Sequence, residues 1–98
     1  MSSKKKKRCH GVNILYIDGH SEDHRFFVDR LKQAFPDYRI LEAFTGEIGR
    51  EFLQRERIDC LVLELDLPDM SGFEFLTNSV QRIGSPYTPV VVLTRTHH

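Results

Sequence analysis

Acidic and hydroxyl side chains stand at the ends of three predicted strands. Asp18 ends an apolar segment near the N-terminus, Glu64 and Asp66 end a second such segment, and Thr94 ends a third. Asp18, Glu64 and Asp66 could together hold Mg²⁺, because Mg²⁺ prefers oxygen ligands and usually takes one or two carboxylates from a protein. The alternative is that strand ends are polar only because they meet water. Spacing alone supports both interpretations.

The segments that must position these residues alternate between strand and helix patterns. Short apolar runs predict strands over residues 12–17, 38–43, 58–65 and 90–94, and helical spacing predicts a helix in each interval between them. This alternation predicts an α/β fold with a parallel sheet, right-handed crossovers and helices on both faces. In such sheets, ligands bind beyond the carboxyl ends of the strands. The segment 58–65 is the most apolar and is expected at the centre, whereas 38–43 is expected near an edge.

Short polar motifs predict where the helices begin. Ser21 is expected to cap the first helix, and Thr45 stands at the start of the second. Ser71 and Glu74 have the spacing of a capping box, which predicts the start of the third. Three residues of the second helix are expected to face inward: Ile48, Phe52 and Leu53.

Histidine and cysteine residues offer weaker signals. His20 and His24 are one helical turn apart and could meet a metal together, but ordinary solvent-facing histidines are the favoured interpretation. Cys60 lies in an apolar strand and is expected to be a small core residue. With Cys9 it makes too few cysteines for a disulfide framework or a four-cysteine zinc site. A reducing, cytoplasmic setting is therefore expected.

Length and charge suggest one domain behind a basic tail. The chain has 98 residues, and five of its 14 basic residues lie within residues 4–8. Residues 1–11 are expected to be a flexible tail, with 12–98 as the domain. The tail could hold nucleic acid or an anionic surface, but a solvated leader is the favoured interpretation, so a nucleic-acid partner is not expected. The longest apolar runs are four residues, whereas a membrane-spanning helix needs about 20.

Several motifs together resemble the receiver domain of two-component response regulators. They are residues 14–18 (ILYID), 42–47 (EAFTGE), 64–72 (ELDLPDMSG) and 89–94 (PVVVLT). The resemblance covers residues 12–95. It implies a flavodoxin-like three-layer sandwich with strand order 2-1-3-4, whose fifth strand and last helices are missing here. It also implies a non-enzymatic signalling module in a phosphorelay, with a histidine kinase or another signalling protein as partner.

The resemblance also implies roles for individual residues, and two of them depart from the family pattern. Glu64 stands where the family has its phosphorylated aspartate. Asp18 matches the first of two acids after strand one, but Gly19 stands where the second acid, a metal ligand, is expected. Glutamate is one methylene longer than aspartate, and a misplacement of about 1 Å can cost about 100-fold in rate. Ordinary phosphorylation is therefore not expected, and neither is a cofactor beyond weakly held Mg²⁺.

Three further positions line the implied phosphoryl pocket. Asp66 stands where a backbone carbonyl binds the metal, Thr94 matches the hydroxyl that contacts the phosphoryl group, and Arg95 replaces a small residue. Glu64 could act as a permanent, weak substitute for the phosphorylated state, or it could be inert. The alternative is a working acceptor that uses Asp66 or Glu64 with Mg²⁺. A second alternative is an adaptor for nucleic acid or an anionic surface, led by the basic tail.

The last predicted strand has no predicted strand after it. Its apolar residues, 90–93, would then form an unpaired edge, which is a template for another strand. We therefore expect either that a longer regulator supplies the missing elements or that the chain associates with itself through Val90 to Leu93.

Overall fold

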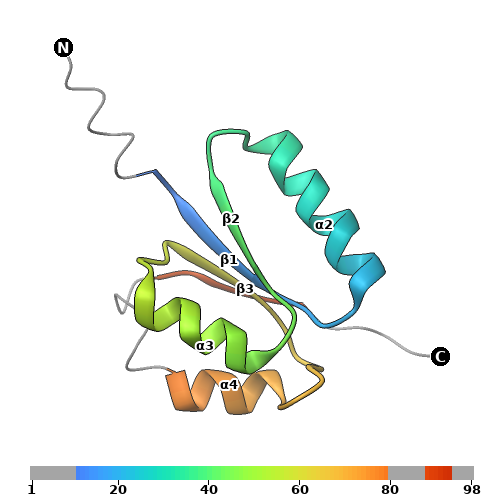
Figure 1. Cartoon of the computed structure of the whole chain (residues 1–98), viewed down its shortest axis with the longest axis vertical. Coiled ribbons are helices and arrows are strands. Elements are labelled where there is room, and N and C mark those ends of the chain that lie inside the picture. Colours follow the sequence, from blue (N-terminus) through green and yellow to red (C-terminus); the bar gives the residue numbers. More distant parts are fainter. Residues whose placement is uncertain (1–10, 80–87, 94–98) are drawn as a thin grey trace.

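Four parallel strands form one sheet in the order β2-β1-β3-β4 in the computed structural model (Figure 1). The structure describes residues 11–79 and 88–93. The strands are β1 (Asn13–Ile17), β2 (Arg39–Ala43), β3 (Cys60–Glu64) and β4 (Val90–Leu93). The predicted flavodoxin-like α/β fold and its strand order 2-1-3-4 are confirmed, with β3 inside the sheet and β2 at an edge.

Within residues 11–79 and 88–93, three helices cover the two faces of this sheet. Helix α2 (Ser21–Ala34) lies on one face, and α3 (Gly46–Arg55) and α4 (Gly72–Ser79) lie on the other (Figure 1). Each helix connects two parallel strands, as the crossover rule requires. The loops that follow β1, β2 and β3 therefore meet at one edge of the sheet.

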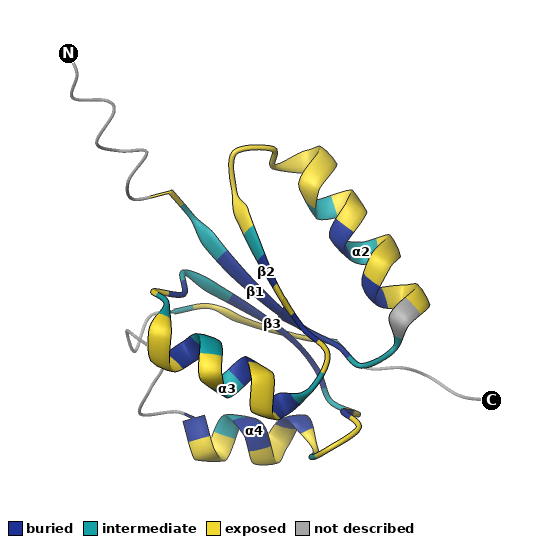
Figure 2. Ribbon diagram, viewed as in Figure 1, coloured by how far each residue is buried: buried dark blue, intermediate teal, exposed yellow. Residues whose placement is uncertain are grey.

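Alternation along β1 produces two apolar cores. Leu15 and Ile17 are fully buried in the cluster that includes Phe75 of α4. Ile14 and Tyr16 point to the opposite face and pack with Val28 of α2. Figure 2 shows the resulting band of buried residues through β1 and β3. Strands covered on both faces are apolar at successive positions, which explains why these segments stood out in the sequence.

Two of the three predicted helix caps are present in the structure. Thr45 caps α3, since its side chain accepts a hydrogen bond from the Ile48 backbone N at 3.1 Å. The Ser71 hydroxyl accepts one from the Glu74 backbone N at 3.0 Å. Ser21, however, is the first residue of α2 rather than its cap. His20 holds the cap position, without a side-chain cap bond, because its ring is turned toward Asp18 instead.

The inward face of α3 also differs from the prediction. Ile48 is 42% exposed, whereas Gly49 is buried. A Cβ at Gly49 would overlap the Ile17 side chain and lie 3.3 Å from the Phe75 ring. Helix α3 therefore packs closely against β1 at Gly49, where there is no side chain. This close packing places the neighbouring Ile48 on the outer side of the helix.

Two parts of the prediction fall outside the described residues. The first is residues 1–10 of the expected basic tail, and the second is the pair Thr94 and Arg95 of the implied phosphoryl pocket. Within the parts that are described, no helix is both long and apolar enough to cross a membrane.

Candidate functional site

Asp18 lies at the carboxyl end of β1, where several groups fix its carboxylate. The residue is only 1% exposed. The Tyr16 hydroxyl donates to Asp18 Oδ2 at 2.6 Å, and the His20 backbone N donates to Oδ1 at 2.9 Å. The His20 ring Nδ1 lies 3.1 Å from the same Oδ1. The carboxylate is therefore held in one orientation by its own strand and by the loop that follows it.

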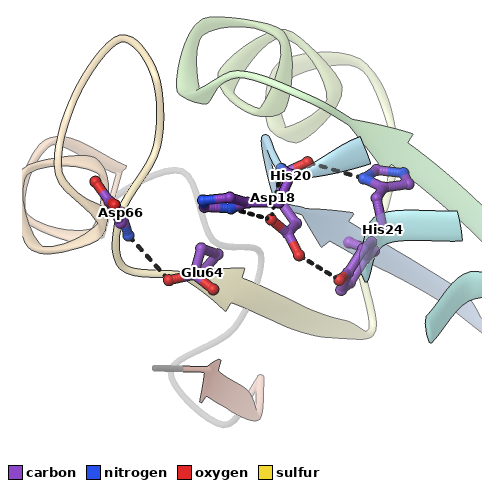
Figure 3. A network of polar contacts seen from close by, with 6 residues as sticks. Asp18, His20, His24, Glu64 and Asp66 are labelled. Carbon is purple, nitrogen blue, oxygen red and sulfur yellow. Dashed lines mark hydrogen bonds and ion pairs between the residues drawn. The ribbon is translucent and has the colours of Figure 1, made fainter. Parts of the chain in front are cut away.

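Glu64 lies beside Asp18 at the end of the neighbouring strand β3 (Figure 3). It is 2% exposed, and its Oε2 accepts a hydrogen bond from the Asp66 backbone N at 3.1 Å. One ligand atom each from Asp18, His20 and Glu64 can be chosen so that all lie within 4.8 Å of one another. The parallel sheet thus brings together two of the acids singled out in the sequence, and the β1–α2 loop adds an imidazole that the sequence analysis did not place there.

Asp66 does not join this group. Its side chain is exposed, and its segment forms an antiparallel bridge with Ser71. Figure 3 shows Asp66 on the loop beyond Glu64, away from Asp18. The proposed metal set of Asp18, Glu64 and Asp66 is therefore not assembled in this structure, because the turn after β3 directs the Asp66 backbone, rather than its carboxylate, at Glu64.

Gly19 is enclosed by the same turn. A Cβ at this position would lie 2.5 Å from Pro68 Cδ and 3.1 Å from the Phe44 carbonyl oxygen. An acid at position 19 would therefore require the Pro68 loop to shift. A hollow of about 150 Å³ lies next to this contact, lined by Gly19, His20, Asp66, Leu67 and Pro68.

His24 is not solvent-facing, so that prediction was wrong. It is 1% exposed, with Nδ1 2.8 Å from the Asp18 carbonyl oxygen and Nε2 3.0 Å from Glu42 Oε1. Its ring stacks on Phe44 at 3.9 Å and meets the Tyr16 ring edge at 4.8 Å. Both oxygens are hydrogen-bond acceptors, and either ring nitrogen can donate to its partner when it carries the ring hydrogen. The sequence signal was its spacing to Val28, which places both on the inward face of α2.

Cys60 behaves as the sequence suggested. It is partly buried at the start of β3 and packs against the α2-side core. Burial and the neighbouring Asp59 carboxylate raise the pKa of its thiol. The reactive thiolate is therefore scarcer at neutral pH than for an ordinary cysteine.

Comparisons with known proteins point to one family. The family model described as "Response regulator receiver domain" matches residues 15–98. A probable cyclic di-GMP phosphodiesterase of Vibrio cholerae is 30% identical over 94 residues, which are 96% of this chain and 20% of that protein. The response regulator Rcp1 of Synechocystis is 29% identical over 92 residues, with 87% of this chain and 63% of that protein covered. The chain thus spans less than two thirds of either relative.

A solved structure agrees with the fold. The chemotaxis response regulator CheY4 of Vibrio cholerae matches with a TM-score of 0.78 over 90% of this chain and 72% of that one, at 23% identity. At this identity the likeness concerns the arrangement of strands and helices.

Proposed function

Because this chain belongs to the response regulator receiver domain family, we propose that it passes signals through protein–protein contacts without ordinary phosphorylation at Glu64. Receiver domains serve two-component signalling and interact with histidine kinases and other signalling proteins. We propose a partner of that kind, a cytoplasmic setting and no enzymatic activity for the chain itself. The single observation that carries the proposal is the state of Glu64, which stands at the acceptor position and is buried and bonded to its own loop.

The Glu64 carboxylate is badly placed for attack on a phosphorus atom. Formation of an acyl phosphate needs a carboxylate oxygen in line with the leaving group of the donor. The extra methylene of Glu64 moves its oxygens away from the position that an aspartate would give. One of these oxygens accepts the Asp66 backbone N–H at 3.1 Å. Phosphorylation would have to break that bond and expose a side chain that is 2% exposed.

Gly19 adds a second obstacle. It supplies no oxygen ligand beside Asp18, and Pro68 occupies the space that a side chain at position 19 would need. A site that lacks this ligand neutralises less of the charge that builds up during phosphoryl transfer. The two departures act on different parts of the reaction, so their costs combine.

Self-association gives this module a contact surface of its own. In the described part of the chain, β4 pairs with β3 on one side, and Val90, Val91 and Val92 are all exposed. An apolar strand edge with free backbone groups is a template for another strand. We propose that a second copy pairs there.

Incubation with acetyl phosphate and Mg²⁺, followed by intact-mass measurement at mildly acidic pH, tests the main proposal. We expect no phosphoryl adduct on the unmodified chain. The matched control is Glu64→Asp combined with Pro68→Ala and Gly19→Asp, which restores both acids and removes the ring atoms nearest position 19. We expect this variant to gain an adduct if it keeps the circular dichroism spectrum of the parent.

A phosphoryl adduct on the unmodified chain would contradict the proposal. Loss of that adduct in Asp66→Asn would then assign the acceptor to Asp66, and its loss in Glu64→Gln would assign it to Glu64. Glu64→Asp alone serves as a second control if the triple variant does not fold, because its side chain is smaller than the one it replaces.

A further inference from the structure

We propose that Asp18, His20 and Glu64 form a binding site for a divalent transition-metal ion such as Zn²⁺, in place of Mg²⁺. Receiver domains typically bind Mg²⁺ beside the phosphorylation position. The residues present here fit that ion poorly, because one of the three grouped donors is an imidazole nitrogen and the acid expected at Gly19 is absent. Mg²⁺ is held by oxygen ligands in near-octahedral geometry.

The three donors are close enough to share one ion after small movements. His20 Nδ1 and Asp18 Oδ1 are already 3.1 Å apart, and the whole set lies within 4.8 Å. Zinc bonds to nitrogen and carboxylate oxygen are about 2.0–2.2 Å long, so two ligands of one ion are at most about 4 Å apart. A side-chain rotation that moves the ligand atom of Glu64 or His20 by about 1 Å or less would close the remaining gap.

Neighbouring groups hold two of the ligands in place. The Tyr16 hydroxyl donates to Asp18 Oδ2 and leaves Oδ1 on the side of His20. The Asp66 backbone N donates to Glu64 Oε2. Hydrogen bonds of this kind orient metal-binding side chains and raise affinity. The site is therefore pre-arranged at the ends of two adjacent strands: Glu64 is the last residue of β3, Asp18 directly follows β1, and His20 lies two residues further along the same loop.

The donor chemistry favours a transition metal. Imidazole nitrogen suits Zn²⁺, Cu²⁺ and Ni²⁺, whereas Mg²⁺ selects oxygen ligands. Before metal binds, Nδ1 can donate to Asp18 Oδ1 across the 3.1 Å contact. On binding, the neutral ring carries its hydrogen on Nε2, and the unprotonated Nδ1 takes the ion instead. Two carboxylates offset the charge of a divalent ion, so this exchange leaves no excess charge among the buried donors.

The hollow beside His20 leaves room for water next to the proposed site. It has a volume of about 150 Å³ and is lined by His20 and by the Gly19–Pro68 contact. Three protein ligands with water in a fourth position is the arrangement of an open zinc site. An acid at position 19 would put a carboxylate beside this hollow, so its absence leaves space on the side where water must enter.

Metal titration of the full chain tests this proposal. Calorimetry with ZnCl₂ and with MgCl₂ is expected to show Zn²⁺ binding at least about 100-fold tighter than Mg²⁺. Titration with CoCl₂ is expected to develop visible d–d absorption typical of a low-coordinate site. His20→Ala should weaken Zn²⁺ binding at least about 100-fold and abolish the cobalt spectrum, since loss of even an outer-shell partner costs 10–100-fold. Glu64→Gln should weaken binding in the same direction.

The control variants separate this site from other histidines. His97→Ala with His98→Ala removes chain-end imidazoles and should leave tight binding unchanged, as should Asp37→Asn, which changes an exposed acid in a turn. The proposal fails if binding disappears in the chain-end variant, if His20→Ala binds Zn²⁺ as tightly as the parent, or if Mg²⁺ binds as tightly as Zn²⁺. None of these outcomes depends on phosphorylation, so the metal site and the signalling proposal can fail separately.

Discussion

At the scale of single residues, His24 links the candidate site to the second strand. Its Nδ1 lies within hydrogen-bond distance of the Asp18 carbonyl oxygen, and its Nε2 lies within hydrogen-bond distance of the Glu42 carboxylate. Its ring is packed between Phe44 and Tyr16. A buried polar group that loses its partner costs about 1–3 kcal/mol of stability. His24 therefore has a structural task beside the site, distinct from the metal-binding task proposed for His20.

Replacement of His24 by Leu is expected to lower the free energy of unfolding by about 1–3 kcal/mol, because it removes the buried hydrogen bond to the Asp18 carbonyl. Urea unfolding followed by circular dichroism, with a chelator present, measures this. Gln33→Leu is the matched control, since it places the same side chain at an exposed position of the same helix. Equal stability of the two variants would show that the His24 bonds contribute nothing net.

At the scale of elements, the loop after β3 is tied to the start of α3. The Asp69 carboxylate accepts hydrogen bonds from the Gly46 backbone N at 2.8 Å and the Glu47 backbone N at 3.0 Å. The Thr45 hydroxyl caps the same helix by accepting a hydrogen bond from the Ile48 backbone N. Two free backbone donors at a helix start and the positive end of its dipole both favour a carboxylate there. The loop that carries Asp66 and Pro68 is thus anchored to the opposite side of the site.

Replacement of Asp69 by Ala is expected to cost about 0.5–2 kcal/mol of stability, as for loss of a helix cap. Asp69→Asn should cost less, because one oxygen acceptor remains. Thermal and urea unfolding of both variants test this, with Asp37→Ala as a control for an exposed aspartate in a turn. If Asp69→Ala proved as stable as the control, the two hydrogen bonds would have no net effect.

At the scale of the whole molecule, the sheet is covered unevenly. Both neighbours of β1 and β3 are strands, and both faces of these strands are buried (Figure 2). The outer strand β4 is different, since Val91 is 45% exposed and its flanking valines are exposed as well. An apolar edge of this kind favours strand addition by a partner.

Replacement of Val91 by Lys is expected to reduce self-association, because a charge on an edge strand opposes pairing with a second edge. Light scattering across a concentration series measures the change in mass. Ile48→Lys is the control, since Ile48 is 42% exposed but lies on α3. A parent chain that stays monomeric throughout the series would contradict self-association through β4.

The amino-acid sequence by itself determined the order and type of the elements, because the apolar runs of β1 and β3 and the helical spacing between them are local patterns. It also placed Asp18 and Glu64 together, because parallel strands bring their carboxyl ends to one edge. The approach of Pro68 to Gly19, the turn of the His20 ring onto Asp18 and the burial of His24 were decided only by tertiary structure. Each depends on contacts between segments that pack against one another, and the spacing of residues along the chain does not determine such contacts.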